Sequence, residues 1–179
     1  LSEGVDQIII GRSSLPELNA TSVLTPGQPI GVFLGLDYLG TWKDQAEIDA
    51  SNLDPSQKSG LKPGDQKYGD YNGDTFIDSG DEHVIGNPTP KLFGGLNANI
   101  RYKNFDLGLY FYGSYGNDLY YREWNDHAYS DTRSNNLAIV GNRWTPTNNE
   151  AYLPRVDAIQ HIRSSTADVH DGSYLRLKT

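Results

Sequence analysis

Residues 90–118 read PKLFGGLNANIRYKNFDLGLYFYGSYGND, and this stretch decides the fold because it contains two long alternating runs. In the first run one face carries Leu92, Gly94, Leu96, Ala98, Ile100 and Tyr102, and the other carries Phe93, Gly95, Asn97, Asn99 and Arg101. In the second run one face carries Phe105, Leu107, Leu109, Phe111, Gly113 and Tyr115, and the other carries Asp106, Gly108, Tyr110, Tyr112 and Ser114. The alternation predicts antiparallel strands at 91–102 and 105–117.

Only Lys103-Asn104 separates the two runs, so we expect a two-residue hairpin turn in which Asn104 takes the positive φ. Each run has about the 9–11 residues that a tilted strand needs to cross a bilayer, which is longer than a typical soluble strand. The expected lipid-facing residues are Leu92, Leu96, Ile100, Leu107, Leu109 and Phe111, and the expected lumen-facing residues are Asn97, Asn99, Arg101 and Asp106. Alternation alone also fits a hairpin of a soluble β-sandwich, so the rest of the chain has to distinguish the two.

The connections around this hairpin are very unequal in length. The sequence predicts further strands at 30–42, with Val32 and Leu34 facing lipid, and at 173–179. The intervening loops, 43–88 and 119–171, are about 50 residues each, and 43–53 has the composition of a short helix. Loops longer than about 15 residues are uncommon in compact soluble domains. Short turns on one side and long loops on the other are typical of outer-membrane barrels, so we expect both loops to be extracellular.

Composition excludes several classes of function. The net charge is −8, with 23 acidic and 15 basic residues and no basic cluster, which argues against nucleic acid as a partner. There is no cysteine, so thiol chemistry and disulfides are excluded. The chain starts at Leu1, has no methionine and shows no signal-peptide pattern, so we expect it to be an internal piece of a larger protein.

An acidic loop at 70–81, DYNGDTFIDSGD, has the spacing of a calcium-binding loop. The expected ligands, at loop positions 1, 3, 5, 7, 9 and 12, are Asp70, Asn72, Asp74, the Phe76 carbonyl, Asp78 and Asp81. Thr75 stands where such loops normally have glycine, and Asp81 is shorter than the usual final glutamate. The loop therefore predicts either a structural Ca²⁺ site or a turn held by Asx hydrogen bonds without a metal.

No enzyme signature is present. The four histidines form no close pair, and no nucleophile, phosphate-binding or dinucleotide motif occurs, so we expect no catalytic residues. Aromatic residues gather near the outer end of the hairpin, where they could contact a substrate or partner, or form an interfacial girdle and pack the loops. These residues are Tyr115, Tyr120, Tyr121, Trp124 and Tyr129.

Three blocks of the sequence together resemble the C-terminal barrel region of SusC/RagA-type TonB-linked outer-membrane proteins. The first is PGQPIGVFLGLDYLGTW and the last is DGSYLRLK. The most specific block, LKPGDQKYGDYNGDTFIDSGDEHVIGNPTPKLFGGLNANIRYKNFDLGLYFYGSYGND, has the acidic loop, the IGNPTP entry and the YKNFDL hairpin in the order found in the family.

The resemblance implies an all-β fold in which residues 1–179 form a fragment of an antiparallel transmembrane barrel of about 22 strands, without the plug domain. It also implies import of glycans or peptides across the outer membrane of a Gram-negative bacterium. The implied partners are outer-membrane lipid, a SusD-like surface lipoprotein, and the TonB complex acting through the absent plug. The alternative, from the residues alone, is a secreted calcium-stabilised β module that binds carbohydrate.

Overall fold

The computed structural model describes residues 8–10, 22–24, 26–121, 128, 135–156, 158 and 163–178. Its strands are β1 (Ile8–Ile10), β2 (Ser22–Leu24), β3 (Val32–Gly35), β4 (Tyr38–Thr41), β5 (Gln66–Tyr68), β6 (His83–Gly86), β7 (Leu92–Tyr102), β8 (Phe105–Tyr115), β9 (Asp118–Tyr120), β10 (Val169–Asp171) and β11 (Tyr174–Lys178). The short helices are α1 (Gln45–Ala50) and α2 (Pro55–Lys58), with 3₁₀ turns η1 (Ser79–Asp81), η2 (Ala138–Asn142) and η4 (Thr166–Asp168). No helix in the described ranges is long and apolar enough to cross a membrane.

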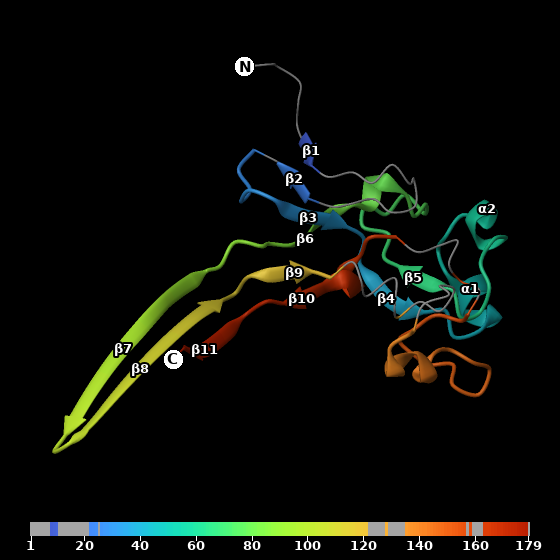
Figure 1. Ribbon diagram of the computed structural model, residues 1–179. Helices are drawn as coiled ribbons and strands as arrows, with labels where there is room; N and C mark the ends of the chain where they lie inside the picture. The colour runs from blue at the N-terminus through green and yellow to red at the C-terminus, as the bar shows by residue number, and fades with distance from the viewer. Residues whose placement is uncertain are drawn as a thin grey trace.

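The strands pair antiparallel, which confirms the predicted fold class, and they form two distinct parts. The first part is a sheet of order β11-β8-β7, which we call the projecting sheet because its long hairpin extends away from the rest of the chain (Figure 1). The second part, the packed unit, contains α1, α2, the sheet β1-β2-β3-β6 and the pairs β4-β5 and β9-β10. The chain therefore separates one thin sheet from a compact region at one end of it.

The β7–β8 hairpin is paired in register along its whole length, from Leu92 opposite Tyr115 to Tyr102 opposite Phe105. Its strands begin and end within two residues of the expected 91–102 and 105–117. The turn differs from the expectation in one respect, because the positive φ belongs to Lys103, at 53°, and not to Asn104. A positive φ at the first turn residue still gives the twist that a tight hairpin needs.

The predicted single strand at 30–42 is wrong. The structure divides it into β3, which pairs with β2 and β6, and β4, which pairs with β5. Val32 is fully buried and Leu34 is only partly exposed, so neither belongs to a lipid-facing surface. The predicted loops 43–88 and 119–171 contain β5, β6, β10 and most of β9, and α1 lies within the helix expected at 43–53.

Contacts with a distant part of the chain explain the break between β3 and β4. The Leu36 amide donates to the Ser164 carbonyl at 2.9 Å, and the Leu36 carbonyl accepts from the Thr166 amide at 3.0 Å. The next strand is then held by the Thr166 hydroxyl, which accepts from the Tyr38 amide at 2.9 Å. Because these backbone groups are used by residues 164–166, the chain cannot continue the β3 ladder past Leu36.

The packed unit has its own core. Its most buried apolar side chains are Val23, Val32, Leu36, Ile48 and Leu153, with Trp42 close behind. The helix α1 contributes Ile48 and begins at Asp44, whose side chain accepts from the Glu47 amide at 2.8 Å. Burial raises the pKa of both Tyr38 and Tyr68 well above the usual value for tyrosine, which agrees with interior positions for these rings.

A bulge joins the two parts. Between the β8–β11 pairing and the β9–β10 pairing, residues 115–117 on one side oppose only residues 172–173 on the other. The Gly172 amide donates to the Asn117 carbonyl at 2.8 Å, and the Gly116 amide donates to the Ser173 hydroxyl at 2.9 Å. Gly116 has φ of 74°, as expected for the extra residue of a bulge. The ribbon therefore continues from the projecting sheet into the packed unit with a change of direction.

The buried ion pair of the packed unit gives a first prediction. Asp65 is fully buried, and its carboxylate accepts from Arg155 Nε at 2.7 Å and from the Lys62 amide at 2.8 Å. Replacing Asp65 by Asn removes the buried negative charge that accepts from the Arg155 guanidinium, so we expect the free energy of unfolding of the packed unit to fall by about 3 kcal/mol. Urea titration followed by tryptophan fluorescence measures this loss.

The matched control is Glu150→Gln, which removes the partner of Lys43 in an exposed pair. Solvent screens that pair, so this variant should unfold like the unaltered protein. Equal losses in the two variants would show that burial of Asp65 has no special effect.

Candidate functional site

The register of the projecting sheet sorts its side chains onto two faces. Leu96 lies opposite Phe111, and Ile100 lies opposite Leu107, so the apolar residues of β7 and β8 share one face. On the third strand Leu175 lies opposite Gly113 and Leu177 opposite Phe111, which extends that face across β11. The alternation seen in the sequence therefore becomes a real two-faced sheet.

The apolar face is uncovered. Leu92, Leu96 and Leu175 are 68%, 64% and 76% exposed, although each stands beside other large apolar side chains. The rings of Tyr102 and Phe105 stand at the turn end of this face, and the ring of Tyr115 stands at the other end. A soluble protein seldom leaves such a continuous apolar surface in water, so this face requires an apolar environment.

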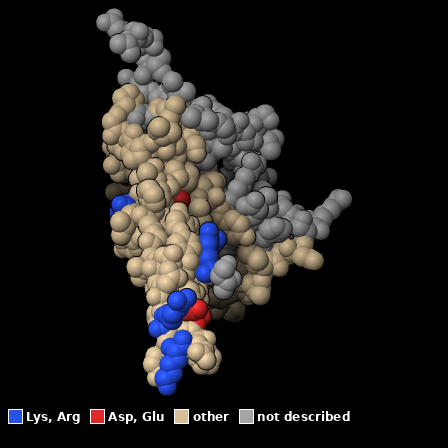
Figure 2. Space-filling view, turned by 60° about the vertical axis from the view of Figure 1, so that its left-hand side comes forward, with Lys and Arg blue, Asp and Glu red and all other residues tan. Residues whose placement is uncertain are grey.

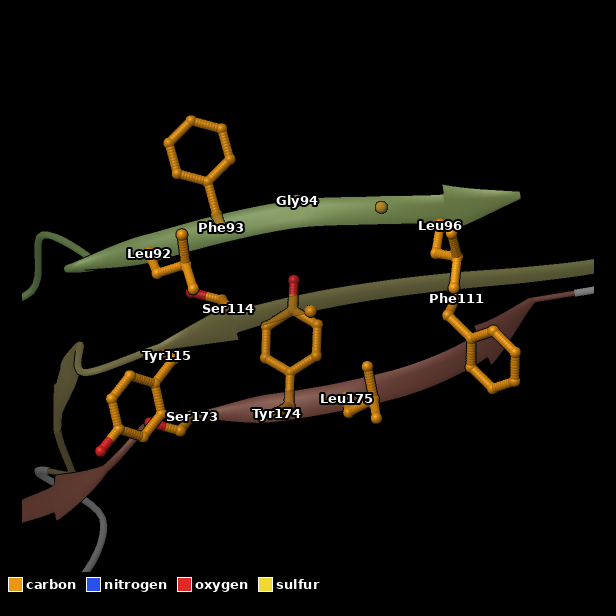
Figure 3. A pocket seen from close by; sticks show the side chains of 12 residues that line it. Leu92, Phe93, Gly94, Leu96, Phe111, Ser114, Tyr115, Ser173, Tyr174 and Leu175 are labelled. Atoms are coloured by element: carbon orange, nitrogen blue, oxygen red, sulfur yellow. The ribbon is translucent and has the colours of Figure 1, made fainter. Parts of the chain in front are cut away.

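A shallow groove of about 710 Å³ crosses the apolar face where glycine meets glycine. Gly94 lies directly opposite Gly113, and the missing side chains leave a gap between larger neighbours. Figure 3 shows Leu92 and Tyr115 at one end of this groove and Leu96 and Phe111 at the other. Residues of both faces border the groove, since Phe93, Gly95, Ser114 and Tyr174 of the opposite face line it together with the apolar residues.

The opposite face of the sheet is polar and aromatic. Near the turn, Arg101 and Asp106 face each other and form two hydrogen bonds, of 2.5 and 3.2 Å. Further along, Tyr110 lies opposite Asn97 on one side and Lys178 on the other, and Tyr112 lies opposite Arg176. This face has the residues expected to meet water.

Sequence reasoning missed the contribution of β11 to the polar face. The sequence predicts a strand at 173–179, and the register places its Tyr174 opposite Ser114 on the polar face. Arg176 and Lys178 follow on the same side of the strand. The alternation of Tyr174, Arg176 and Lys178 with two leucines is the signal that would have identified them.

Hydrogen bonds from backbone amides hold the acidic loop. Asp70 accepts from the amides of Gly73 and Thr75, at 2.6 and 2.8 Å. Asp81 is fully buried and accepts from the amides of Tyr71, Asn72 and Asp78, at 2.9 to 3.2 Å. The three other expected side-chain ligands also accept from amides of the loop: Asn72 accepts from the amide of Asp74, Asp74 from that of Phe76, and Asp78 from that of Gly80. The structure thus brings the predicted ligands into one hydrogen-bonded loop.

The oxygen donors of this loop suit Ca²⁺ in kind and in order. Their placement is that of a loop held by its own amides, because no group of three or more acidic or histidine side chains in the described ranges is arranged to hold a metal ion. Thr75 has φ of 75°, the left-handed conformation that glycine adopts without strain. The calcium site therefore stays a prediction, and the departure at Thr75 has a clear structural cost.

The three described residues of the predicted aromatic contact set lie on different surfaces. Tyr115 belongs to the apolar face of the projecting sheet, where it lies opposite Leu92. Tyr120 packs its ring 5.7 Å from that of Phe33 and bonds to the Ser164 hydroxyl at 2.9 Å, so it stabilises the packed unit. Tyr121 is 40% exposed beside His170. The two other residues of this prediction, Trp124 and Tyr129, lie outside the described residues.

Comparison with known proteins found relatives over almost the whole chain. TonB-dependent receptor P26 of Formosa agariphila is 40% identical over 179 residues, covering 98% of this chain and 18% of that protein. TonB-dependent receptor P3 of the same organism is 32% identical over 158 residues, and TonB-dependent receptor SusC of Bacteroides thetaiotaomicron is 30% identical over 115 residues. The chain thus spans less than a fifth of the length of these curated relatives. No family model matches the chain.

Comparison with solved structures agrees on the fold. The structure of the RagAB peptide transporter superposes with a TM-score of 0.68 and 20% identity, covering 99% of this chain and 18% of that one. The RagAB peptide importer in its open-open state superposes with a TM-score of 0.64. The arrangement of a thin sheet attached to a packed unit therefore occurs in a solved transporter.

The left-handed residue of the acidic loop gives a second prediction. Replacing Thr75 by Gly removes the strain of a side chain at positive φ, so the packed unit should gain about 1 kcal/mol of stability. Thr75→Ala keeps the Cβ atom and should bring no such gain. The urea midpoint of each variant measures the effect, and an equal gain from alanine would show that the threonine hydroxyl, not backbone strain, is responsible.

Proposed function

The chain belongs to the SusC/RagA-type TonB-dependent receptors, and we propose that its projecting sheet forms part of the transmembrane barrel wall of such a receptor. The observation that carries this proposal is the continuous apolar face shared by β7, β8 and β11. In this arrangement the apolar face meets outer-membrane lipid and the polar face lines the lumen. The cell would be a Gram-negative bacterium, whose envelope includes an outer membrane.

The packed unit then lies on the extracellular side. The two-residue turn at Lys103-Asn104 marks the opposite, periplasmic end of the hairpin, since outer-membrane barrels have short turns there. At the other end, β9 and β10 extend the strands β8 and β11 into the packed unit (Figure 1). Long excursions that fold into a compact unit are what the outer side of a barrel would present to a substrate or a partner.

The activity proposed for the complete receptor is nutrient import by binding and conformational change, without covalent catalysis. The names of the relatives support this proposal, since they are TonB-dependent receptors and one superposed structure is a peptide transporter. A SusD-like surface lipoprotein would capture glycan or peptide at the outer side. The TonB complex would supply energy through a plug domain. The acidic composition argues against nucleic acid as a partner.

The alternative of a secreted carbohydrate-binding module is less favoured by the structure. Such a module would need the apolar residues of β7, β8 and β11 in a core, and none of the described segments covers them. The packed unit, in contrast, has a buried apolar core that does not use this face. One part that buries an apolar core and another that exposes an apolar face are consistent with a protein that lies partly in lipid.

For the acidic loop we propose a structural Ca²⁺ ion, because its oxygen donors are of the kind that Ca²⁺ prefers. The loop braces the excursion between β5 and β6 and contributes no group to the projecting sheet. Ca²⁺ binding to the folded state alone stabilises that state by mass action, so calcium at about 100 times its Kd should add about 2.7 kcal/mol. The thermal midpoint of the packed unit, measured with calcium and then with excess EGTA, tests this, and Asp74→Asn should weaken the response. An unchanged thermal midpoint would contradict the proposed ion, and the hydrogen bonds of the loop alone would then hold its conformation.

Substitution on the two faces of one strand tests the wall assignment. Leu96→Arg puts a cation into lipid near mid-strand and should cost about 2–4 kcal/mol of folding free energy. Asn97→Arg, one residue along and on the polar face, should cost little. The measurement is the amount of heat-modifiable receptor recovered in the outer-membrane fraction. Equal recovery of both variants, or release of the receptor into buffer, would contradict the proposal.

A further inference from the structure

Two cations on the polar face of the projecting sheet are held against tyrosine rings. The guanidinium carbon of Arg176 lies 4.5 Å from the ring centroid of Tyr174. Lys178 Nζ lies 5.3 Å from the ring centroid of Tyr112, on the neighbouring strand. The two rings are themselves 6.1 Å apart and tilted, so the four side chains form one cluster across β8 and β11. Contact with a ring restricts each cation without neutralising it.

Exposed aromatic side chains share this face with the cations: Tyr110 lies opposite Lys178, and Phe93 lies further away on β7. Phe93 is 69% exposed and Tyr110 is 41% exposed, although both stand on the polar face. A Cβ atom at Gly95 would come within 3.0 Å of the Tyr110 hydroxyl, so the Tyr110 ring lies across this glycine. Gly95 itself lies opposite Tyr112. The glycine thus makes room for an aromatic platform directly beside the cation cluster.

The cluster has no acidic partner within the described part of the chain. On this face Asp106 is already bonded to Arg101, near the turn. Neither Arg176 nor Lys178 forms an ion pair with any described residue. Figure 2 shows Lys and Arg side chains following the projecting strands down to their tip, with acidic groups beside them mainly near the tip. The middle of the polar face is therefore positively charged in a chain whose net charge is −8.

We propose that Arg176 and Lys178, with the rings of Tyr110 and Phe93, form a lumen subsite for an anionic saccharide, one that carries carboxylate or sulfate groups. A guanidinium stacked on a ring still presents N–H donors at its edge, where they can bind an oxyanion bidentately. The two cations are two residues apart on one strand, about 7 Å, so they can contact successive charged groups of an extended chain. The exposed rings offer apolar surface to the faces of sugar rings.

The position of the cluster favours a saccharide over an acidic peptide. Extended peptides are commonly bound through backbone hydrogen bonds to a free strand edge. Here β8 is already paired on both sides, and closure of the proposed barrel would also pair the outer edge of β11, so only side chains on the face of the sheet are offered to a ligand. Rings, cations and the Asn97 amide are groups that recognise a hydroxylated ring with an acidic substituent. This inference rests on the proposed barrel, because only there does the polar face line the lumen.

The experiment uses the full-length receptor purified in detergent and a hexameric oligogalacturonate as the probe. Titration calorimetry should show binding to the unaltered receptor that weakens as salt is raised. The double variant Arg176→Gln with Lys178→Gln should lose about tenfold in affinity, since two exposed charge contacts together are worth about 1.4 kcal/mol. The matched control is Arg101→Gln, a cation on the same face that is bonded to Asp106, and it should keep its affinity within about twofold.

A second readout does not depend on the substitutions. Acylation of Lys178 by a water-soluble succinimidyl ester, followed by mass spectrometry, should be slowed by oligogalacturonate and not by neutral maltohexaose. Unchanged affinity of the double variant, or no protection of Lys178, would overturn the subsite. Tighter binding of hexaglutamate than of oligogalacturonate would overturn its assignment to a saccharide.

Failure of the subsite is separable from failure of the barrel. Each variant is first checked for heat-modifiable mobility in the outer-membrane fraction. Loss of heat modifiability in the unaltered receptor would contradict the wall itself and, with it, the lumen position of the cluster. A heat-modifiable receptor that does not bind oligogalacturonate would overturn only the subsite.

Discussion

A strand that crosses a bilayer must hydrogen-bond its backbone N–H and C=O groups to neighbouring strands, because hydrocarbon offers no other partner. The in-register pairing of β7 with β8 meets this requirement on the facing edges of these two strands. The outer edges of β7 and β11 pair with no other described strand. Both edges need neighbours before the sheet can lie in lipid, so closure into a barrel with further strands follows from the same constraint.

The pairing also fixes which side chains meet lipid. Side chains alternate strictly along a strand, so a slip of one residue would exchange the two faces. At one end of the hairpin, the tight turn with Lys103 at positive φ holds the register of β7 with β8. At the other end, the bulge at Gly116 redirects the chain and lies beyond this pairing, so the register is unchanged. The apolar face therefore depends on the alignment of β7 with β8, and the tyrosine-held cations depend on the alignment of β8 with β11.

The sequence was sufficient to predict the hairpin because local alternation, strand length and turn length all agree over residues 91–117. It was insufficient at 30–42, where the same alternation was present. There the decisive contacts are made by residues 164–166, which capture Leu36 and divide the run, and no local pattern reports a partner so distant. In the acidic loop, the sequence already showed Thr75 at the position where calcium loops normally have glycine. The structure adds that Thr75 takes the left-handed conformation.

The cation cluster was beyond sequence reasoning for a similar reason. Arg176 and Lys178 are unremarkable in a list of residues, and their relation to Tyr112 arises only when β11 pairs with β8. The acidic loop illustrates the opposite case, in which spacing was informative about which residues gather. It was less informative about what they bind, because the same oxygens that could hold a cation also accept backbone amides.

The most direct test of the two-faced wall is a nitroxide scan along β7 in the full-length receptor reconstituted into lipid vesicles. Single labels at successive positions from 94 to 100 would be exposed in turn to oxygen, which concentrates in lipid, and to a water-soluble nickel chelate. The wall predicts high oxygen accessibility at 94, 96, 98 and 100 and high nickel accessibility at 95, 97 and 99, with a period of two residues. A scan without that period, or with the two sets exchanged, would contradict the assignment of faces on which this account rests.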